Sequence, residues 1–150
     1  MEIERKWLVE APSDESLNAP SQRIDQGYLA IEPDGNETRV RRKEDHYFLT
    51  VKSAGGLARE EYEIELNFEQ FAALWPATEG RRVEKTRYVA DGIELDLYAG
   101  ALAGLIIAEV EFTSEEEAVA YVPPSWFGPE VTADRRYKNH SLAVDGRPTP

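Results

Sequence analysis

The sequence predicts an α+β protein: an eight-stranded antiparallel β-barrel, or tunnel, with a charged lumen and a few outer helices. Most of the chain alternates apolar and polar residues with a period of two, as half-buried strands do. Charged residues recur on one face of strand after strand, grouped by sign. Helical signals are too few to cover the apolar side of an open sheet of this width. A barrel has no edges and places its apolar face outward beneath few helices.

Composition excludes several classes of protein. The chain has 150 residues, which fits a single domain spanning residues 1–150, and its net charge of −12 argues against a nucleic-acid partner. The absence of cysteine removes disulfides, thiol nucleophiles and zinc–thiolate sites. The start carries no apolar leader, and the longest uncharged apolar run, 97–108, is too short to span a membrane. We expect a cytoplasmic monomer or homodimer with no membrane partner.

Turn signals divide the chain into its expected strands. Pro33-Asp34-Gly35-Asn36 separates the second strand from the third, and Asp91-Gly92 is a hairpin signal between the sixth and seventh. Segment 11–21 is rich in Pro, Ser and Asn and predicts a surface connection with at most one helical turn. We expect strands at 2–10, 23–31, 36–43, 46–53, 58–66, 82–90, 93–98 and 105–113.

Three short helices are expected. Asn67 is a candidate N-cap for a helix that runs through Trp75. Ser114, followed by three glutamates, begins a second helix that reaches about Val122, because acidic residues favour a helix N-terminus. A third helix is expected near 139–144.

The charged faces of the strands define the expected lumen. Side chains two apart share a face of a strand, so Glu2, Glu4 and Lys6 lie opposite Ile3 and Trp7. For one strand a sheet with a wet face explains this pattern, but its recurrence on seven strands favours a lumen. The expected lumen acids are Glu2, Glu4, Glu61, Glu63, Asp96, Glu109 and Glu111, and the bases are Lys6, Arg39, Arg41, Lys52, Lys85 and Arg87.

Such a lumen suits one kind of ligand. The pairs Glu2/Glu4 and Glu109/Glu111 can each converge on one cation, and carboxylate oxygens favour Mg²⁺, Mn²⁺ or Ca²⁺ over zinc. Arg and Lys are the usual partners of phosphate oxygens. The combination predicts a ligand with several phosphates held together with metal, as phosphoryl transfer requires. No phosphate-binding loop, nucleophile elbow or HExxH motif is present.

Glu2-Ile3-Glu4-Arg5-Lys6 resembles the ExExK signature of the CYTH superfamily, the triphosphate tunnel metalloenzymes. The resemblance covers nearly the whole chain and is strongest to short bacterial members that act as inorganic triphosphatases. Trp7 departs mildly, because a smaller aromatic is usual there. Further motifs follow in the family's order: Gln26-Gly27-Tyr28-Leu29, Arg39-x-Arg41, Thr50-Val51-Lys52, Glu61-Tyr62-Glu63, Glu84-Lys85-Thr86-Arg87-Tyr88, Leu95-Asp96, Glu109-Val110-Glu111-Phe112 and Tyr137-Lys138-Asn139.

The resemblance implies roles for these residues. Lys6 and Tyr28 are similar to a catalytic pair that assists proton transfer or water activation. Glu61 and Asp96 would support the site, either by holding coordinated water or by orienting the bases, and a purely structural charge partnership fits them equally well. The implied ligands of Mg²⁺ or Mn²⁺ are Glu2, Glu4 and Glu111, with Glu63 and Glu109 close by, and the implied triphosphate clamp is Arg39, Arg41, Lys52, Lys85 and Arg87.

The leading hypothesis is therefore metal-dependent hydrolysis of inorganic triphosphate (tripolyphosphate) to pyrophosphate and phosphate. Hydrolysis of nucleoside or thiamine triphosphates would need a pocket for the organic part, and adenylate cyclase activity of class IV type is a further alternative within the family. Outside the enzymes, a non-catalytic module that binds polyphosphate or nucleotide, or a structural β-domain with a solvated charged face, stays open.

Overall fold

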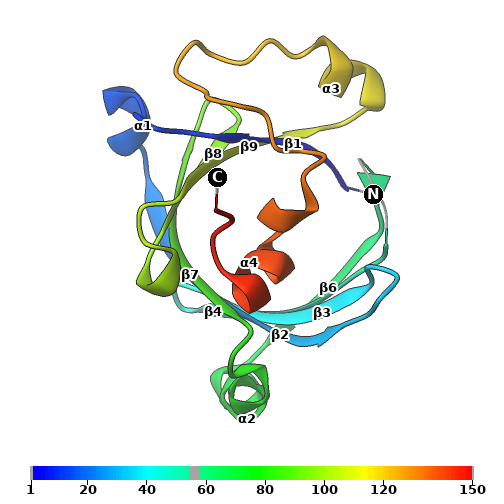
Figure 1. Ribbon diagram of the computed structural model, residues 1–150. Coiled ribbons are helices and arrows are strands. Elements are labelled where there is room, and N and C mark those ends of the chain that lie inside the picture. Colours follow the sequence, from blue (N-terminus) through cyan, green and yellow to red (C-terminus); the bar gives the residue numbers. More distant parts are fainter. Residues whose placement is uncertain (1, 55–57, 150) are drawn as a thin grey trace.

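The fold is an antiparallel sheet that curls into a barrel, seen end-on in the computed structural model of Figure 1, which describes residues 2–54 and 58–149. Its nine strands follow the order β5-β1-β9-β8-β7-β2-β3-β4-β6. They are β1 (Glu2–Leu8), β2 (Ser21–Ile31), β3 (Glu37–Lys43), β4 (His46–Lys52), β5 (Ala58–Arg59), β6 (Glu61–Leu66), β7 (Arg82–Ala90), β8 (Ile93–Tyr98) and β9 (Ile106–Phe112).

The expected count of eight strands is wrong, because segment 58–66 forms two strands instead of one. β5 pairs with β1, whereas β6 pairs with β4, at the opposite end of the strand order. Only Glu60 separates them, so this short segment joins the two ends of the sheet and nearly closes the barrel. Two neighbouring strands that diverge cannot both stay paired along their full length, and the ladder therefore breaks where the segment passes from one to the other.

Local capping explains two of the outer helices. Asn67 and Gln70 exchange side-chain and backbone hydrogen bonds in a capping box at the start of α2 (Phe68–Leu74), which continues as a 3₁₀ helix, η1 (Trp75–Thr78). Ser114 accepts from the Glu117 amide at the start of α3 (Glu115–Ala120), which ends two residues before the expected end. Both predicted helices are confirmed. Within the described residues, no helix has the length and apolar character that crossing a membrane would demand.

The expectation that the helices lie outside the barrel is correct for α1 (Asp14–Leu17), α2 and α3, but wrong for α4 (Asn139–Asp145). Figure 1 shows α4 within the ring of strands. The Tyr98 hydroxyl donates to Asn139 Oδ1 at 2.7 Å, and His140 Nδ1 lies 2.5 Å from Glu37 Oε2. The first turn of α4 is thus fastened to β8 and to β3, and the helix fills one end of the barrel.

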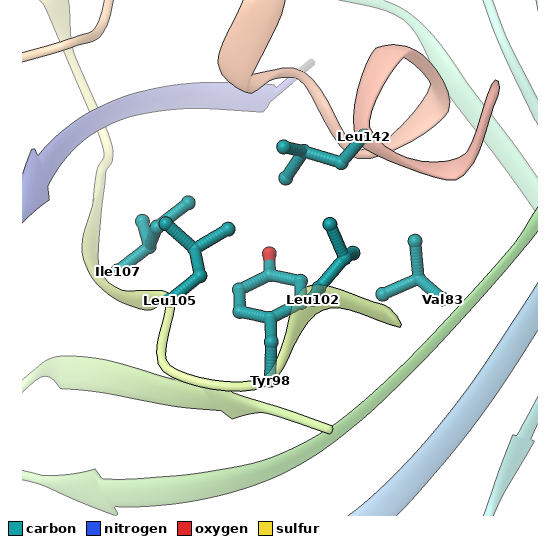
Figure 2. Packing of buried hydrophobic residues seen from close by; sticks show 6 residues of the cluster. All are labelled: Val83, Tyr98, Leu102, Leu105, Ile107 and Leu142. Carbon is teal, nitrogen blue, oxygen red and sulfur yellow. The ribbon is translucent and has the colours of Figure 1, made fainter. Parts of the chain in front are cut away.

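The lumen is apolar where α4 enters it. Leu142 packs there among buried side chains from three strands, the 3₁₀ helix η2 (Gly100–Leu102) and the turn before β9, as Figure 2 shows: Val83, Tyr98, Leu102, Leu105 and Ile107. On the same inward strand faces the next positions are charged, at Lys85, Asp96 and Glu109. The barrel interior therefore has an apolar end, filled by α4, and a charged remainder. The packed apolar side chains form the base of the charged part.

The outward faces of β1, β8 and β9 are covered by the segment that follows α3. Trp7 is 2% exposed, and its ring lies 4.9 Å from that of Phe127. The Gly128 amide donates to the Leu8 carbonyl at 2.7 Å, an approach that a Cβ on Gly128 would block at 2.6 Å from the same oxygen. The unusual Trp7 thus packs outside the barrel, as its position on β1 predicts, and does not enter the lumen.

Candidate active site

Three glutamates from neighbouring strands converge in the charged part of the lumen. Glu4 on β1 lies directly opposite Glu111 on β9, and Glu2 follows two residues away on the same face. One carboxylate oxygen from each lies within 4.8 Å of the others. Burial, and next the Glu109 carboxylate, raise the pKa of Glu4 to about 7, because both disfavour a negative charge on Glu4. Hard oxygen donors crowded in this way fit a divalent cation such as Mg²⁺ or Mn²⁺.

The two other expected ligands lie outside the acidic trio. Glu109 sits deeper, with its carboxylate oxygens 3.7 Å from Lys6 Nζ and 3.8 Å from Arg87 Nη2. Burial acts to raise the pKa of Glu109, but Lys6 and Arg87 hold it below its usual value. Its Oε1 has no hydrogen-bond partner among the described residues. Glu63 is exposed and accepts from the Thr50 hydroxyl at 2.7 Å. The structure thus brings together three of the five glutamates expected to bind metal.

A cavity of about 200 Å³ lies beside the acidic trio. Its lining is Glu2, Glu4, Arg39, Arg41, Lys43, Lys52, Glu61, Glu63, Arg87, Glu94, Glu109, Glu111 and Asn139. The expected lumen set omitted Lys43 and Glu94, although both continue the alternation already used for their strands. Asn139 belongs to the Tyr137-Lys138-Asn139 motif but was given no role, because no strand pattern marks a residue on an inserted helix. A smaller cavity of about 50 Å³ shares Glu2 and Glu4 and reaches Lys6 and Lys138.

On the β7–β8 wall of the lumen, the cations are tied to one carboxylate. Asp96 lies 2.8 Å from Lys85 Nζ and accepts from Arg87 Nε and Nη2 at 2.7 and 2.8 Å. Burial acts to raise the pKa of Asp96, but Lys85 and Arg87 hold it well below its usual range. Arg87 also contacts Glu94 at 2.9 Å. Of the two cations, Arg87 lines the larger cavity, whereas Lys85 lines neither.

On the β2–β3 wall, the cations lack such a partner. Arg41 Nε donates to the neutral Gln26 Oε1 at 3.0 Å, and no ion pair joins Arg41 to a carboxylate in the described part of the chain. Arg39 has one ion pair there, with Glu61 at 4.0 Å, and its buried Nε has no hydrogen-bond partner among these residues. Burial, then the charges of Arg39 and Arg87, lower the pKa of Arg41 to about 10. This wall therefore presents uncompensated positive charge to the cavity.

The remaining expected site residues are distributed around the acidic trio. Lys52 Nζ lies 2.9 Å from Glu2, and Glu61 lines the larger cavity beside them. Burial acts to lower the pKa of Lys6, but Glu109 and Glu4 raise it above its usual value, so Lys6 is an ammonium. Tyr28 is fully buried and lines neither cavity, and burial raises the pKa of its hydroxyl to about 12.

Comparison with known proteins places this arrangement in a family. The chain is 55% identical over 148 residues to the inorganic triphosphatase of Nitrosomonas europaea, a match that covers 95% of this chain and 97% of that protein. The chain belongs to the inorganic triphosphatase family. It is also 37% identical over 147 residues to the inorganic triphosphatase of Acetivibrio thermocellus, covering 94% of this chain and 92% of that protein.

Structural comparison agrees with this membership. A crystal structure of an inorganic triphosphatase matches with a TM-score of 0.72 and 49% identity, over 97% of this chain and 95% of that one. No protein-family model matches the sequence. For this member of the inorganic triphosphatase family, the charged lumen is the candidate active site.

Proposed function

We propose that this protein hydrolyses inorganic triphosphate to pyrophosphate and phosphate with the help of Mg²⁺ or Mn²⁺. The observation that carries the proposal is that the acidic trio shares one cavity with Arg41, whose hydrogen-bond partner is the neutral Gln26, and with Arg39, whose ion pair with Glu61 spans 4.0 Å. The names of the two relatives support it. We further propose that the chain is a member of the CYTH superfamily, whose ExExK signature matches residues 2–6.

The lining of the larger cavity favours an inorganic substrate. Twelve of the 13 lining residues are charged and the other is Asn139, so the cavity offers no apolar or aromatic side chain. A nucleobase or a thiamine ring binds against apolar and aromatic surface, which this cavity does not provide. The hydrolysis of organic triphosphates and the cyclisation of ATP therefore have less support than the hydrolysis of tripolyphosphate.

Binding divides between the two charge types. Arg39, Arg41 and Arg87 would each present guanidinium nitrogens to phosphate oxygens, and Lys52 would add a point charge beside Glu2. Glu2, Glu4 and Glu111 would hold the cation, with Glu63 and Glu109 as nearby acids. A divalent cation at this place would neutralise phosphate charge and lower the pKa of coordinated water. Phosphoryl transfer depends mostly on such positioning and charge neutralisation.

The chemical step exchanges one P–O bond for another. The oxygen of water bonds to the terminal phosphorus, the bond from that phosphorus to the bridging oxygen breaks, and the pyrophosphate leaves with that oxygen. One proton of the water passes to the solvent, and the other stays on the phosphate product. Lys6, an ammonium beside Glu109, would donate a hydrogen bond to an oxygen of the substrate. Tyr28, which is buried and neutral, would assist proton transfer or water activation. Asp96 and Glu61 would keep the bases in place.

The test is the release of phosphate from tripolyphosphate, ATP and thiamine triphosphate with Mg²⁺, with Mn²⁺ or with EDTA. We expect tripolyphosphate to be cleaved fastest, to give equal amounts of phosphate and pyrophosphate, and to be stable when EDTA is present. If the purified protein releases nothing from any of the three with either metal, the proposal fails. Formation of cyclic AMP from ATP would favour the cyclase alternative.

A further inference from the structure

Gln26 connects two residues that the site would use. Its side chain on β2 is fully buried, and it faces the lumen two residues before Tyr28. Across the ladder to β3, Gln26 lies directly opposite Arg41. Arg41 Nε donates to Gln26 Oε1 at 3.0 Å, and Gln26 Nε2 donates to the Tyr28 hydroxyl oxygen at 2.9 Å. One buried amide thus joins an arginine at the cavity wall to a tyrosine beneath it.

The direction of these hydrogen bonds follows from chemistry. A guanidinium has only donors, so Arg41 Nε requires the carbonyl oxygen of the amide. The amide nitrogen must then face Tyr28, whose oxygen accepts and whose own hydrogen points away from Gln26. Because the amide cannot flip without setting two donors against each other, it fixes the position of Arg41 and the orientation of the Tyr28 hydroxyl together.

The neutrality of Gln26 matters as much as its hydrogen bonds. On the other wall, Asp96 holds Arg87 by two hydrogen bonds, but its negative charge cancels much of the field that Arg87 presents to the cavity. Of the guanidinium nitrogens of Arg41, Gln26 accepts a hydrogen bond from Nε alone, and the amide adds no charge. The terminal nitrogens of Arg41 and its full positive charge stay available to an anion in the cavity.

The backbone of β2 is braced from outside at the same place. A Cβ on Gly27 would lie 2.4 Å from Oγ1 of Thr78, which is fully buried in η1. Only glycine allows this close approach of β2 to η1. Thr78 is itself held, because its hydroxyl donates to the Trp75 carbonyl at 2.7 Å. The support behind Gly27 keeps Gln26 and Tyr28 turned inward on either side of it.

We propose that Gln26 is a positioning residue for substrate binding: it holds the Arg41 guanidinium by Nε so that the terminal nitrogens face the triphosphate with their charge uncancelled. The inference rests on the proposed function, since the anion that Arg41 would bind is the tripolyphosphate substrate. Gln26 itself lines neither cavity, so it would act through Arg41.

Two substitutions separate the hydrogen bond from the charge. Gln26→Glu keeps an acceptor for Arg41 and nearly the same shape but adds a negative charge, whereas Gln26→Leu removes both hydrogen bonds. We expect each to raise KM for tripolyphosphate, and Kd measured by calorimetry, by about tenfold, which corresponds to about 1.4 kcal/mol. We expect kcat to change much less. Ser21→Glu, which adds a charge at an exposed position of the same strand, should leave both constants unchanged.

A double-mutant cycle tests whether Gln26 acts through Arg41. In an Arg41→Ala background, Gln26→Leu should have almost no further effect on KM, because the group that it positions is already gone. Additive effects in the cycle would overturn the inference, and so would an unchanged KM and Kd in both Gln26 variants. If Gln26→Leu fails to fold, as circular dichroism would show, the cycle is carried out with Gln26→Met, which is also uncharged and closer in length to glutamine.

A readout without turnover keeps this inference distinct from the proposed function. In ¹⁵N-labelled protein, the Arg41 Nε–H should give a resonance that exchanges slowly with water, identified by its loss in Arg41→Lys. Gln26→Leu should speed its exchange, and Gln26→Glu should not; an unchanged rate in Gln26→Leu would overturn the positioning role. Binding of tripolyphosphate without hydrolysis would overturn the proposed function alone, and a wild-type protein that does not bind it would overturn both.

Discussion

Both walls of the lumen carry buried cations, but the partners of these cations differ between the two walls. On the β7–β8 wall, Lys85 and Arg87 share the buried carboxylate of Asp96, with contacts of 2.7 to 2.8 Å. On the β2–β3 wall, Arg41 is held by a neutral amide, and the ion pair of Arg39 in the described residues spans 4.0 Å. A lumen-facing base is therefore not a substrate ligand by its position alone, because its partner decides whether its charge is available.

This difference has a physical basis. Burying an ion pair costs desolvation energy that the attraction between the charges roughly repays, so a satisfied pair such as Arg87–Asp96 mainly fixes structure. A buried cation with a neutral partner has no counter-charge in the protein, so an anionic ligand can neutralise it. We infer that Asp96 and Lys85 mainly stabilise the β7–β8 wall, where Arg87 also lines the cavity, and that the β2–β3 wall contributes more to binding. The predictions below test this division.

The largest expected effect concerns the acidic trio, which faces the β2–β3 wall. Glu4→Gln should abolish metal-dependent hydrolysis of tripolyphosphate, because it removes a central oxygen ligand of the cation. Its melting temperature should not fall, since the change removes one charge from crowded carboxylates. Initial rates with Mg²⁺ and a thermal melt measure both effects. Glu10→Gln, at an exposed residue just beyond β1, is the matched control, and wild-type activity in Glu4→Gln would refute the metal assignment.

The next effect breaks the β7–β8 wall. Asp96→Asn leaves Lys85 and Arg87 buried without their shared counter-charge, and it should lower the free energy of unfolding by about 3–5 kcal/mol. Chemical denaturation measures the loss. Glu94→Gln, which removes the less buried carboxylate that contacts Arg87, should lower stability by much less. Equal stabilities of the Asp96 variant and the wild type would contradict the structural role of this wall.

A smaller effect, on activity and not on stability, is expected on the β2–β3 wall. Arg41→Ala should lower kcat/KM for tripolyphosphate roughly tenfold to a hundredfold, the range for losing hydrogen bonds to a charged group. Its unfolding free energy should fall by less than that of Asp96→Asn, because only the neutral Gln26 Oε1 loses its partner and no charge is left unpaired. Arg42→Ala, at the exposed neighbour on the outer face, is the control. An unchanged rate at every substrate concentration would remove Arg41 from the binding site.

The smallest effect is a dependence on pH. The pKa of Asp96 is lowered in the folded state, so Asp96 contributes stability above the unfolded pKa of 3.8, and this contribution is lost as the pH falls further. The stability difference between wild type and Asp96→Asn should therefore be constant near neutral pH and narrow below about pH 4. Denaturation of both proteins from pH 7 to pH 3 measures it. A difference that widens in acid would contradict the paired state of Asp96.

Much of the fold could be predicted because its signals are local. The period of two located the strands but merged β5 and β6 into one, and Asp91-Gly92 forms the expected hairpin turn with positive φ at both residues. The break at Glu60 could not be predicted, because it depends on where β1 and β4 diverge around the closed barrel. Nor could the insertion of α4, since an apolar residue such as Leu142 suits the inside and the outside of a barrel equally well.

The sequence by itself determined which side chains share a face of each strand, because alternation is a property of the extended backbone. It thereby assembled the acids and bases of the lumen, whereas the set of Glu2, Glu4 and Glu111 was implied by the resemblance to a known family. Only the tertiary structure decided which charges are paired, because a salt bridge or hydrogen bond forms within a few ångströms, between strands whose neighbours and register the barrel sets. For that reason Asp96 forms salt bridges with Lys85 and Arg87. Gln26, which is uncharged and was not a candidate from the sequence, accepts a hydrogen bond from Arg41.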